Sequence, residues 1–316
     1  MKVLLRKLLR VLSPVQLIAL YYFLAVTVSV ILLSLPVAHK NDVEWSFIDA
    51  LFTAVSAVSV TGLTVVDTAD TFSTAGIWIL AFVLQFGGIG VMALGTFVWL
   101  IFGKRIGLKE RRLIMTDQNQ SNLSGLVKLM KHVLGLILLI ELFGGLILGT
   151  YFLKYFDTPG EAFIHGFFTS ISATTNAGFD ITGSSLIPFQ HDYFVQFIVI
   201  MLLILGAIGF PVLIEVKDFL LSKERKFTFS LFTKLTSVTF FLLVIGGAIG
   251  IFATEARFAF SGKSWHEVIF YSLFQSTTTR SGGLATIDIS QFTHTTILFM
   301  CCLLYTSPSP RDRQKS

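Results

Sequence analysis

Long and short apolar stretches alternate along this chain. Five stretches have the roughly 20 apolar residues that a membrane-crossing helix needs. They predict spanning helices over Pro14–Pro36, Ala75–Phe102, Val133–Leu153, Tyr193–Val216 and Leu235–Thr254. Three shorter stretches each follow a spanning segment and cover Trp45–Val60, Ala162–Thr175 and Val268–Thr279. At roughly 12 to 16 residues they are too short to cross a bilayer, so they predict re-entrant helices that enter the membrane and turn back.

The basic residues are distributed as re-entrance requires. If the short stretches turn back, residues 1–13, 103–131 and 217–234 lie on one side of the membrane and carry 16 Lys and Arg residues. Because cytoplasmic loops are enriched in Lys and Arg, this side is expected to be cytoplasmic, together with the N-terminus. We interpret the apolar N-terminal segment as an uncleaved first helix. The loops on the opposite side carry only Lys40, Lys154, Arg257 and Lys263.

The composition indicates a membrane protein and excludes other classes. Of the 316 residues, 53% are hydrophobic and 14% are charged, whereas soluble domains carry roughly 25% charged residues. The mean hydropathy of +0.76 excludes a disordered chain. Two neighbouring cysteines, Cys301 and Cys302, cannot form a disulfide scaffold or a four-cysteine zinc site. The six histidines are scattered, and we expect neither enzyme activity nor a covalent cofactor.

The chain contains internal repeats. Phe52–Ala57 matches Phe168–Ala173 at four of six positions, and the same register places Gly62 on Gly178, 116 residues later. A third copy places Gly283 another 105 residues along the chain. Parallel repeats of this kind predict units arranged around an axis along the membrane normal. We expect the units to cover residues 1–110, 111–228 and 229–304.

A second pair of matching segments lies inside two of the predicted helices. Gly87-Gly88-Ile89-Gly90 corresponds to Gly206-Ala207-Ile208-Gly209. No strand precedes either segment, so a nucleotide-binding loop is a poor interpretation. Close helix packing is favoured, because small residues let two backbones approach. A bending point during gating is the alternative.

A polar, glycine-containing segment follows each short helix. Irregular backbone at membrane depth persists only where protein or a water-filled path satisfies it, and backbone carbonyls can replace the hydration shell of an ion. Ordinary turn glycines are the alternative, but three glycines recurring in register favour a filter. We therefore predict an ion selectivity filter formed by Val60, Thr61, Gly62, Leu63, Thr175, Asn176, Ala177, Gly178, Phe179, Arg280, Ser281, Gly282, Gly283 and Leu284.

These motifs resemble the filters of the Trk/Ktr/HKT superfamily of potassium transporters. Over about residues 10–304, the chain is most similar to the KtrB-like membrane subunit of bacterial Ktr systems. The resemblance implies an all-α integral membrane fold with four tandem M1–P–M2 (outer helix, pore helix, inner helix) repeats. Three of these are present here, and the third is incomplete. It also implies K+ uptake across the plasma membrane, with K+ held only at the filter and Na+ as an activator in many members.

The resemblance also implies partners. Members of the family form homodimers and dock on a cytosolic, nucleotide-binding KtrA-like ring. A dense basic cluster in the predicted cytoplasmic loop is a candidate docking surface, although membrane topology and lipid headgroups explain the same charges. The cluster consists of Lys104, Arg105, Lys109, Arg111 and Arg112.

The last residues depart from the family pattern. The third inner helix is apolar only over Thr295–Leu304, and residues 305–316 then bring two prolines and four charges. We expect this tail to be unrelated sequence that follows loss of the natural reading frame. If the end is natural, the alternative is a non-conducting fragment or an interaction protein. A coupled secondary transporter is less favoured, because it would show inverted repeats.

Three charged residues carry separate hypotheses. Arg280 could tune the charge of the filter, but a bare cation in the path would repel K+, which favours an ion pair with an outer carboxylate. Asp180 follows its filter segment directly and could form part of an acidic outer vestibule that concentrates cations, or simply keep a loop soluble. Glu141 lies mid-helix in the membrane, where an acid is a functional candidate by default. Helix-packing hydrogen bonds explain Glu141 equally well.

Overall fold

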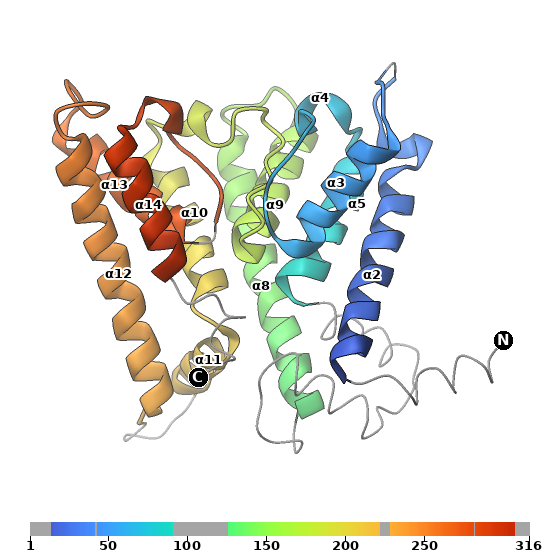
Figure 1. Ribbon diagram of the computed structural model, residues 1–316, viewed down its shortest axis with the longest axis horizontal. Helices are drawn as coiled ribbons and strands as arrows, with labels where there is room; N and C mark the ends of the chain where they lie inside the picture. The colour runs from blue at the N-terminus through green and yellow to red at the C-terminus, as the bar shows by residue number, and fades with distance from the viewer. Residues whose placement is uncertain (1–13, 42, 91–125, 222–227, 281, 307–316) are drawn as a thin grey trace.

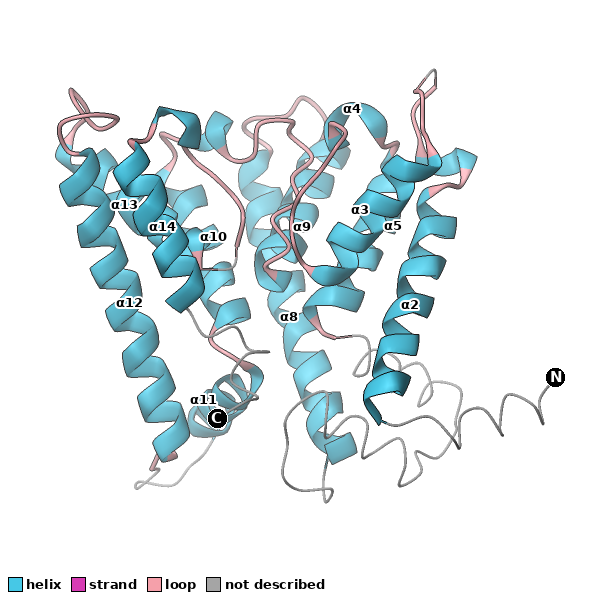
Figure 2. Ribbon diagram, viewed as in Figure 1, coloured by secondary structure: helices cyan, strands magenta, loops and turns pink. Residues whose placement is uncertain are grey.

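The computed structural model describes residues 14–41, 43–90, 126–221, 228–280 and 282–306 (Figure 1). Every regular element within these residues is a helix, and their one β contact is an isolated bridge between His39 and Phe72 (Figure 2). The all-α fold expected from the sequence is therefore confirmed for this part of the chain. In chain order the elements are α2 (Pro14–Leu33), η1 (Pro36–Ala38), α3 (Phe47–Ser59), α4 (Thr68–Thr71), α5 (Thr74–Gly88), α8 (Leu126–Phe152), α9 (Pro159–Thr175), η2 (Ile187–Phe189), α10 (Tyr193–Ala207), α11 (Phe210–Leu221), α12 (Leu231–Glu255), α13 (Trp265–Thr279), η3 (Ile289–Gln291) and α14 (His294–Thr306).

The helices form three consecutive groups. A long apolar helix comes first, a short helix follows, and a third helix completes each group: α2, α3 and α5, then α8, α9 and α10, then α12, α13 and α14. The first and second groups meet where α5 packs on α9, and the second and third where α10 packs on α13. The short helices agree with the predicted short apolar segments to within three residues at each end.

Local sequence signals set where the short helices begin. Ser46 and Asp49 form a reciprocal capping box at the start of α3, and Ser264 and Glu267 do the same for α13. Thr158 caps α9, and a proline occupies its first turn, where the missing N–H is not needed. Each short helix starts at the loops at the top of the view and directs its C-terminal end toward the interior of the helix assembly (Figure 1).

Among the described helices, α2, α8 and α12 are each long and apolar enough to cross a membrane. The predicted span Tyr193–Val216 is not one straight helix: α10 ends at Ala207 and α11 continues at 109° to it, and the two together are long and apolar enough for one bent span. The break occurs because Gly209 adopts a left-handed φ of 99°, which ends the helical hydrogen-bond ladder. The described part of the predicted span Ala75–Phe102 ends as helix at Gly88, and residues 91–102 lie outside the described residues.

The same contact fixes the second and third short helices to the long helix before them. Ser170 on α9 donates to the backbone carbonyl of Glu141 on α8 at 2.9 Å, and Ser276 on α13 donates to that of Val244 on α12 at 2.7 Å. A Cβ added at Gly144 or Gly247 would lie within 2.4 Å of these serine hydroxyls. The small residues therefore let the helices approach closely enough for the bond to form.

The repeated Gly-rich segments also lie at tight helix contacts. A Cβ added at Gly87 on α5 would lie 2.8 Å from the Ala57 carbonyl oxygen of α3. A Cβ added at Gly206 on α10 would lie 2.1 Å from the Thr174 carbonyl oxygen of α9. These distances agree with the close-packing interpretation.

Candidate functional site

Three loops that follow the short helices share one backbone conformation. Gly62, Gly178 and Gly283 have φ angles of 78°, 73° and 71°, in the left-handed region that side chains disfavour. They stand at the corresponding positions of the three sequence copies. The left-handed glycine conformation has therefore formed three times within three different flanking sequences.

The three glycines also meet in space. A Cβ added at Gly62 would lie 2.6 Å from the Ala177 carbonyl oxygen and 3.3 Å from the Gly178 Cα. A Cβ added at Gly178 would lie 3.0 Å from both the Gly283 Cα and the Gly282 carbonyl oxygen. The loops are thus in direct contact through backbone atoms, in the order first, second, third. Any side chain at these positions would force the loops apart.

The first two loops leave their helices in the same way. Val60 and Asn176 are C-caps in the left-handed conformation, with φ of 58° and 54°. In each case the next residue, Thr61 or Ala177, donates its N–H to a carbonyl of the last helical turn at 2.9 Å. For β-branched Val60 this conformation is strained, at a cost of about 1–3 kcal/mol.

The third loop is built differently. Arg280 caps α13 in an ordinary right-handed helical conformation, and both Gly282 and Gly283 donate their N–H groups to the Thr278 carbonyl. Ser281, which the sequence places in the filter, lies outside the described residues.

Hydroxyl groups of two short helices hold the loops behind the glycines. Ser172 Oγ donates to the Phe179 carbonyl at 2.5 Å, and Thr278 Oγ1 donates to the Leu284 carbonyl at 2.7 Å. Phe179 and Leu284 are buried, whereas Leu63 at the corresponding position of the first loop is 59% exposed. The second and third loops are therefore anchored into the core, and the first is not anchored in this way.

The remaining predicted filter residues divide between the helix ends and the loop surface. Thr175 donates its hydroxyl back to the Ile171 carbonyl within α9 at 2.7 Å. Asn176 and Ala177 are buried, whereas Thr61 is exposed and bonds the Ser59 hydroxyl at 2.6 Å.

Arg280 is buried against the long helix of its own group. Its guanidinium donates to the Phe240 carbonyl at 2.8 Å and lies 4.0 Å from the centre of the Phe240 ring. The residue is 5% exposed. These contacts tie the end of α13 to α12 through a backbone carbonyl and an aromatic face, where the sequence suggested an outer carboxylate.

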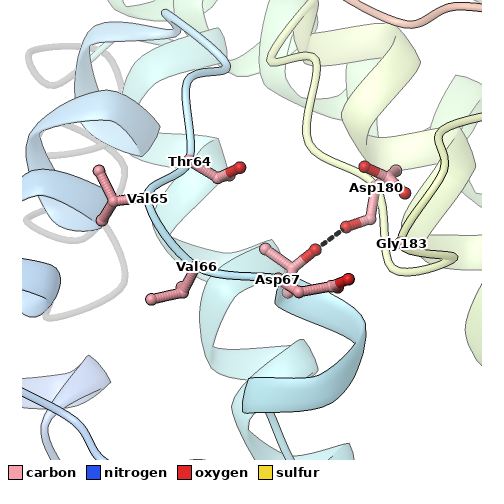
Figure 3. Close-up of a pocket in the computed structure, with 7 residues that line it drawn as sticks. Thr64, Val65, Val66, Asp67, Asp180 and Gly183 are labelled. Atoms are coloured by element: carbon pink, nitrogen blue, oxygen red, sulfur yellow. Dashed lines mark hydrogen bonds between the residues drawn. The ribbon is translucent and has the colours of Figure 1, made fainter. Parts of the chain in front are cut away.

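Asp180 organises the loop in which it stands. Its Oδ2 accepts hydrogen bonds from Thr182 N, Thr182 Oγ1 and Ser185 N, at 3.2, 2.9 and 2.9 Å. Its backbone carbonyl accepts from the Thr68 hydroxyl, which joins the second loop to the first. A pocket of about 280 Å³ opens between these two loops (Figure 3), lined by Thr64, Val65, Val66, Asp67, Thr68, Asp180 and Gly183.

The second and third outer loops are joined as well. Leu186 N donates to the Ala285 carbonyl at 2.9 Å, and Ala285 N donates to the Ser185 hydroxyl at 2.8 Å. The described residues hold no group of three or more His, Cys, Asp or Glu side chains that could bind a metal ion.

Comparison with known proteins places these loops in a family. A family model described as "Cation transport protein" (TrkH) matches residues 12–311. The chain belongs to the TrkH family. The resemblance to the Trk/Ktr superfamily that the sequence motifs indicated is thus confirmed.

Several curated relatives of this TrkH-family chain are potassium transporters by name. It is 73% identical over 304 residues to Ktr system potassium uptake protein D of Bacillus subtilis, covering 96% of this chain and 68% of that protein. It is 34% identical to Ktr system potassium uptake protein B of the same organism, covering 93% and 65%. It is 33% identical to potassium/sodium uptake protein NtpJ of Enterococcus hirae, covering 93% and 64%. The chain thus spans about two thirds of the length of these relatives, and none of them is named as an enzyme.

A solved structure shows the same fold. The potassium transporter TrkH from Vibrio parahaemolyticus superposes with a TM-score of 0.65 at 18% identity, covering 95% of this chain and 58% of that one. The all-helical TrkH fold is therefore shared.

Sequence reasoning missed the residues that hold the loops. Ser172, Thr278, Thr68 and Ser185 make the contacts described above but carried no motif of their own. Ser172 does lie in the repeated segment Phe168–Ala173, but the repeat did not indicate what its hydroxyl would hold. The predicted docking cluster, Lys104, Arg105, Lys109, Arg111 and Arg112, lies outside the described residues.

Proposed function

We propose that this chain moves K+ across the plasma membrane through a selectivity filter formed by residues 60–64, 175–179 and 280–284. The observation that carries the proposal is the contact between Gly62, Gly178 and Gly283, three equivalent glycines with one left-handed conformation. An extended filter needs backbone carbonyls directed at the ion, and a side chain at these positions would fill the path. The names of the potassium uptake relatives support K+ as the transported ion.

The short helices give the site its electrostatic preference. In this proposal α3, α9 and α13 are re-entrant pore helices, and each ends three or four residues before its filter glycine. The C-terminal end of a helix carries a partial negative charge of roughly half an elementary charge. Three such ends directed at one point favour a cation over an anion. Asp67 and Asp180, which line the outer pocket, would add to this preference at the mouth.

The repeat arrangement belongs to the same proposal. Residues 1–110, 111–228 and 229–304 would each form an M1–P–M2 unit, with the N-terminus in the cytoplasm. The recurring Ser170 and Ser276 contacts support equivalent packing of the second and third units. Residues 305–316 would lie outside the pore domain.

Partners and ions follow from the relatives. The name "Ktr system" denotes a membrane subunit that works with others, and we propose a homodimer docked through Lys104, Arg105, Lys109, Arg111 and Arg112 on a nucleotide-binding KtrA-like ring. The potassium/sodium name of the Enterococcus relative supports Na+ as an activating or co-transported ion.

Ion flux into proteoliposomes tests the proposal. K+ and Na+ uptake is measured for this chain and for a chimera in which the C-terminal third of the Bacillus subtilis relative follows residue 304. The expected result is K+ uptake that exceeds Na+ uptake, runs down the gradient and needs no energy source. A chimera that inserts into liposomes but carries neither ion would overturn the proposed function.

A further inference from the structure

One buried polar pair lies outside the filter, between two helices of different groups. Gln85 on α5 donates through Nε2 to Glu141 Oε2 on α8 at 2.7 Å. Gln85 is 8% exposed and Glu141 is 4% exposed. The pair joins the first group of helices to the second within otherwise apolar segments.

The pair leaves two buried oxygen atoms without a hydrogen-bond donor. Within the described residues, Glu141 Oε1 and Gln85 Oε1 are both buried and have no hydrogen-bond partner. When the carboxyl group is ionised, both oxygen atoms can only accept hydrogen bonds, so they cannot form one with each other. A carboxylic acid facing a primary amide can instead form two bonds, one from the amide N–H and one from the acid O–H. A single proton on Glu141 would thus supply the donor that both oxygens lack.

No described group supplies a compensating charge. Titratable and charged side chains lie on α9, α10 and α11, which pack against α8. On α8 itself the bases lie in the first two turns, and Tyr151 lies in the last turn. None of them is an ion-pair or hydrogen-bond partner of Glu141. An ionised, uncompensated carboxylate at membrane depth is expensive. These side chains are Glu161 and His165 on α9, Tyr193 on α10, Glu215, Lys217 and Asp218 on α11, and Lys128, Lys131, His132 and Tyr151 on α8.

The pair lies directly behind the second short helix. The Glu141 carbonyl accepts from Ser170 of α9, and one turn beyond Gln85, a Cβ added at Gly88 would lie 2.4 Å from Thr175 Cβ at the end of α9. The helix that precedes Gly178, α9, therefore contacts both helices that the pair connects.

We infer that Glu141 is a neutral, protonated acid whose pairing with Gln85 locks α5 to α8 and so positions α9 and its filter loop. The protonation and the lock stand independently of transport. The effect on the filter rests on the proposed function.

Infrared spectroscopy of the chain in lipid at neutral pH tests the protonation. The spectrum of wild type minus that of Glu141→Gln is expected to show the carbonyl stretch of a protonated carboxylic acid, with a shift in D2O. Glu141→Gln should also keep the thermal stability of the wild type, because a neutral amide still offers both a donor and an acceptor to Gln85. A difference spectrum that shows the loss of an ionised carboxylate would overturn the inference.

A double-mutant cycle tests the lock. The internal repeats provide apolar replacements, because Ile204 and Val244 stand at the positions that correspond to Gln85 and Glu141. Gln85→Ile should lower the melting temperature by leaving the acid without a partner, and Gln85→Ile with Glu141→Val should restore most of it. A double variant no more stable than Gln85→Ile alone would overturn the lock.

Flux in the same variants tests the positioning. The ratio of K+ to Na+ uptake should fall in Gln85→Ile and recover in the double variant. If the infrared and stability results hold while the uptake ratio stays constant in a conducting protein, the pair is a structural lock alone and the positioning role is overturned. Failure of all variants and the wild type to conduct would count against the proposed function instead.

Discussion

Placing a methyl group on Gly62, the first glycine of the proposed filter, should change ion selection without unfolding the protein. In Gly62→Ala, the new Cβ would lie 2.6 Å from the Ala177 carbonyl oxygen and must move to at least 3.4 Å for an ordinary contact. The obstacle is backbone, so it cannot rotate away. The first and second loops must separate by most of an ångström, and the carbonyl positions that replace the ion's water shift with them.

The chain contains a matched control for the strain at this position. Gly262 has φ of 80°, close to the 78° of Gly62, but a Cβ added there meets nothing within 4 Å. Both alanine substitutions incur the left-handed strain of about 1–2 kcal/mol. Only Gly62→Ala adds the steric overlap. The difference between the two variants therefore isolates contact between the loops from backbone conformation.

The assay is K+ and Na+ flux in proteoliposomes at matched protein content. Gly62→Ala should lower the ratio of K+ to Na+ uptake by roughly tenfold, which corresponds to about 1.4 kcal/mol of lost discrimination. Gly262→Ala should change the ratio by less than about twofold, with a similar loss of thermal stability. Equal uptake ratios in the two variants would refute the filter assignment of Gly62.

Two other predictions concern the outer side of the protein. Burial raises the pKa of Asp192, but hydrogen bonds from Lys154, Tyr155 and Tyr151 outweigh it and hold this pKa at about 2. The resulting stabilisation is present above the ordinary pKa of about 4 and is lost as the pH falls toward 2. Asp192→Asn should therefore cost about 1–3 kcal/mol at neutral pH and remove that part of the acid dependence in thermal scans. Lys154→Met should cost less than Asp192→Asn, because the Lys154 side chain is 47% exposed and water screens its charge, and a larger loss than for Asp192→Asn would contradict the reasoning. Buried Glu255 accepts from Thr293 N and Thr293 Oγ1, each at 2.8 Å, and so anchors α14 to α12. Glu255→Ala should cost about 2–4 kcal/mol and Glu255→Gln clearly less, as measured by thermal unfolding in detergent; equal losses would show that the acceptor atoms do not matter.

Helix type and approximate bounds could be read from the sequence because they depend on local properties. The apolar lengths separated the long helices from the short ones, and the short helices begin within three residues of the predicted starts, at Phe47, Pro159 and Trp265. The glycine register also lay in the sequence, since the repeats place Gly62, Gly178 and Gly283 at equivalent positions.

Contacts between distant segments were decided only by the tertiary structure. The partner of Glu141 is 56 residues away on α5, and Thr68 reaches Asp180 across 112 residues, so no local pattern could name either one. The break between α10 and α11 lies in the segment Gly206–Gly209, where the sequence offered a bending point only as the alternative to close packing. The apolar composition there is that of a straight span, and the left-handed backbone of Gly209 shows the turn.

Arg280 shows most clearly which features the sequence determines and which depend on the tertiary structure. The sequence determined that a cation follows the third short helix, and charge repulsion argued that it should not face the path. The group that the Arg280 guanidinium would contact instead depended on which helix packs beside it. Packing of α12 against α13 placed the Phe240 carbonyl and ring there. Periodicity and composition fix what each segment forms, whereas the partners of its polar groups follow from how the segments pack.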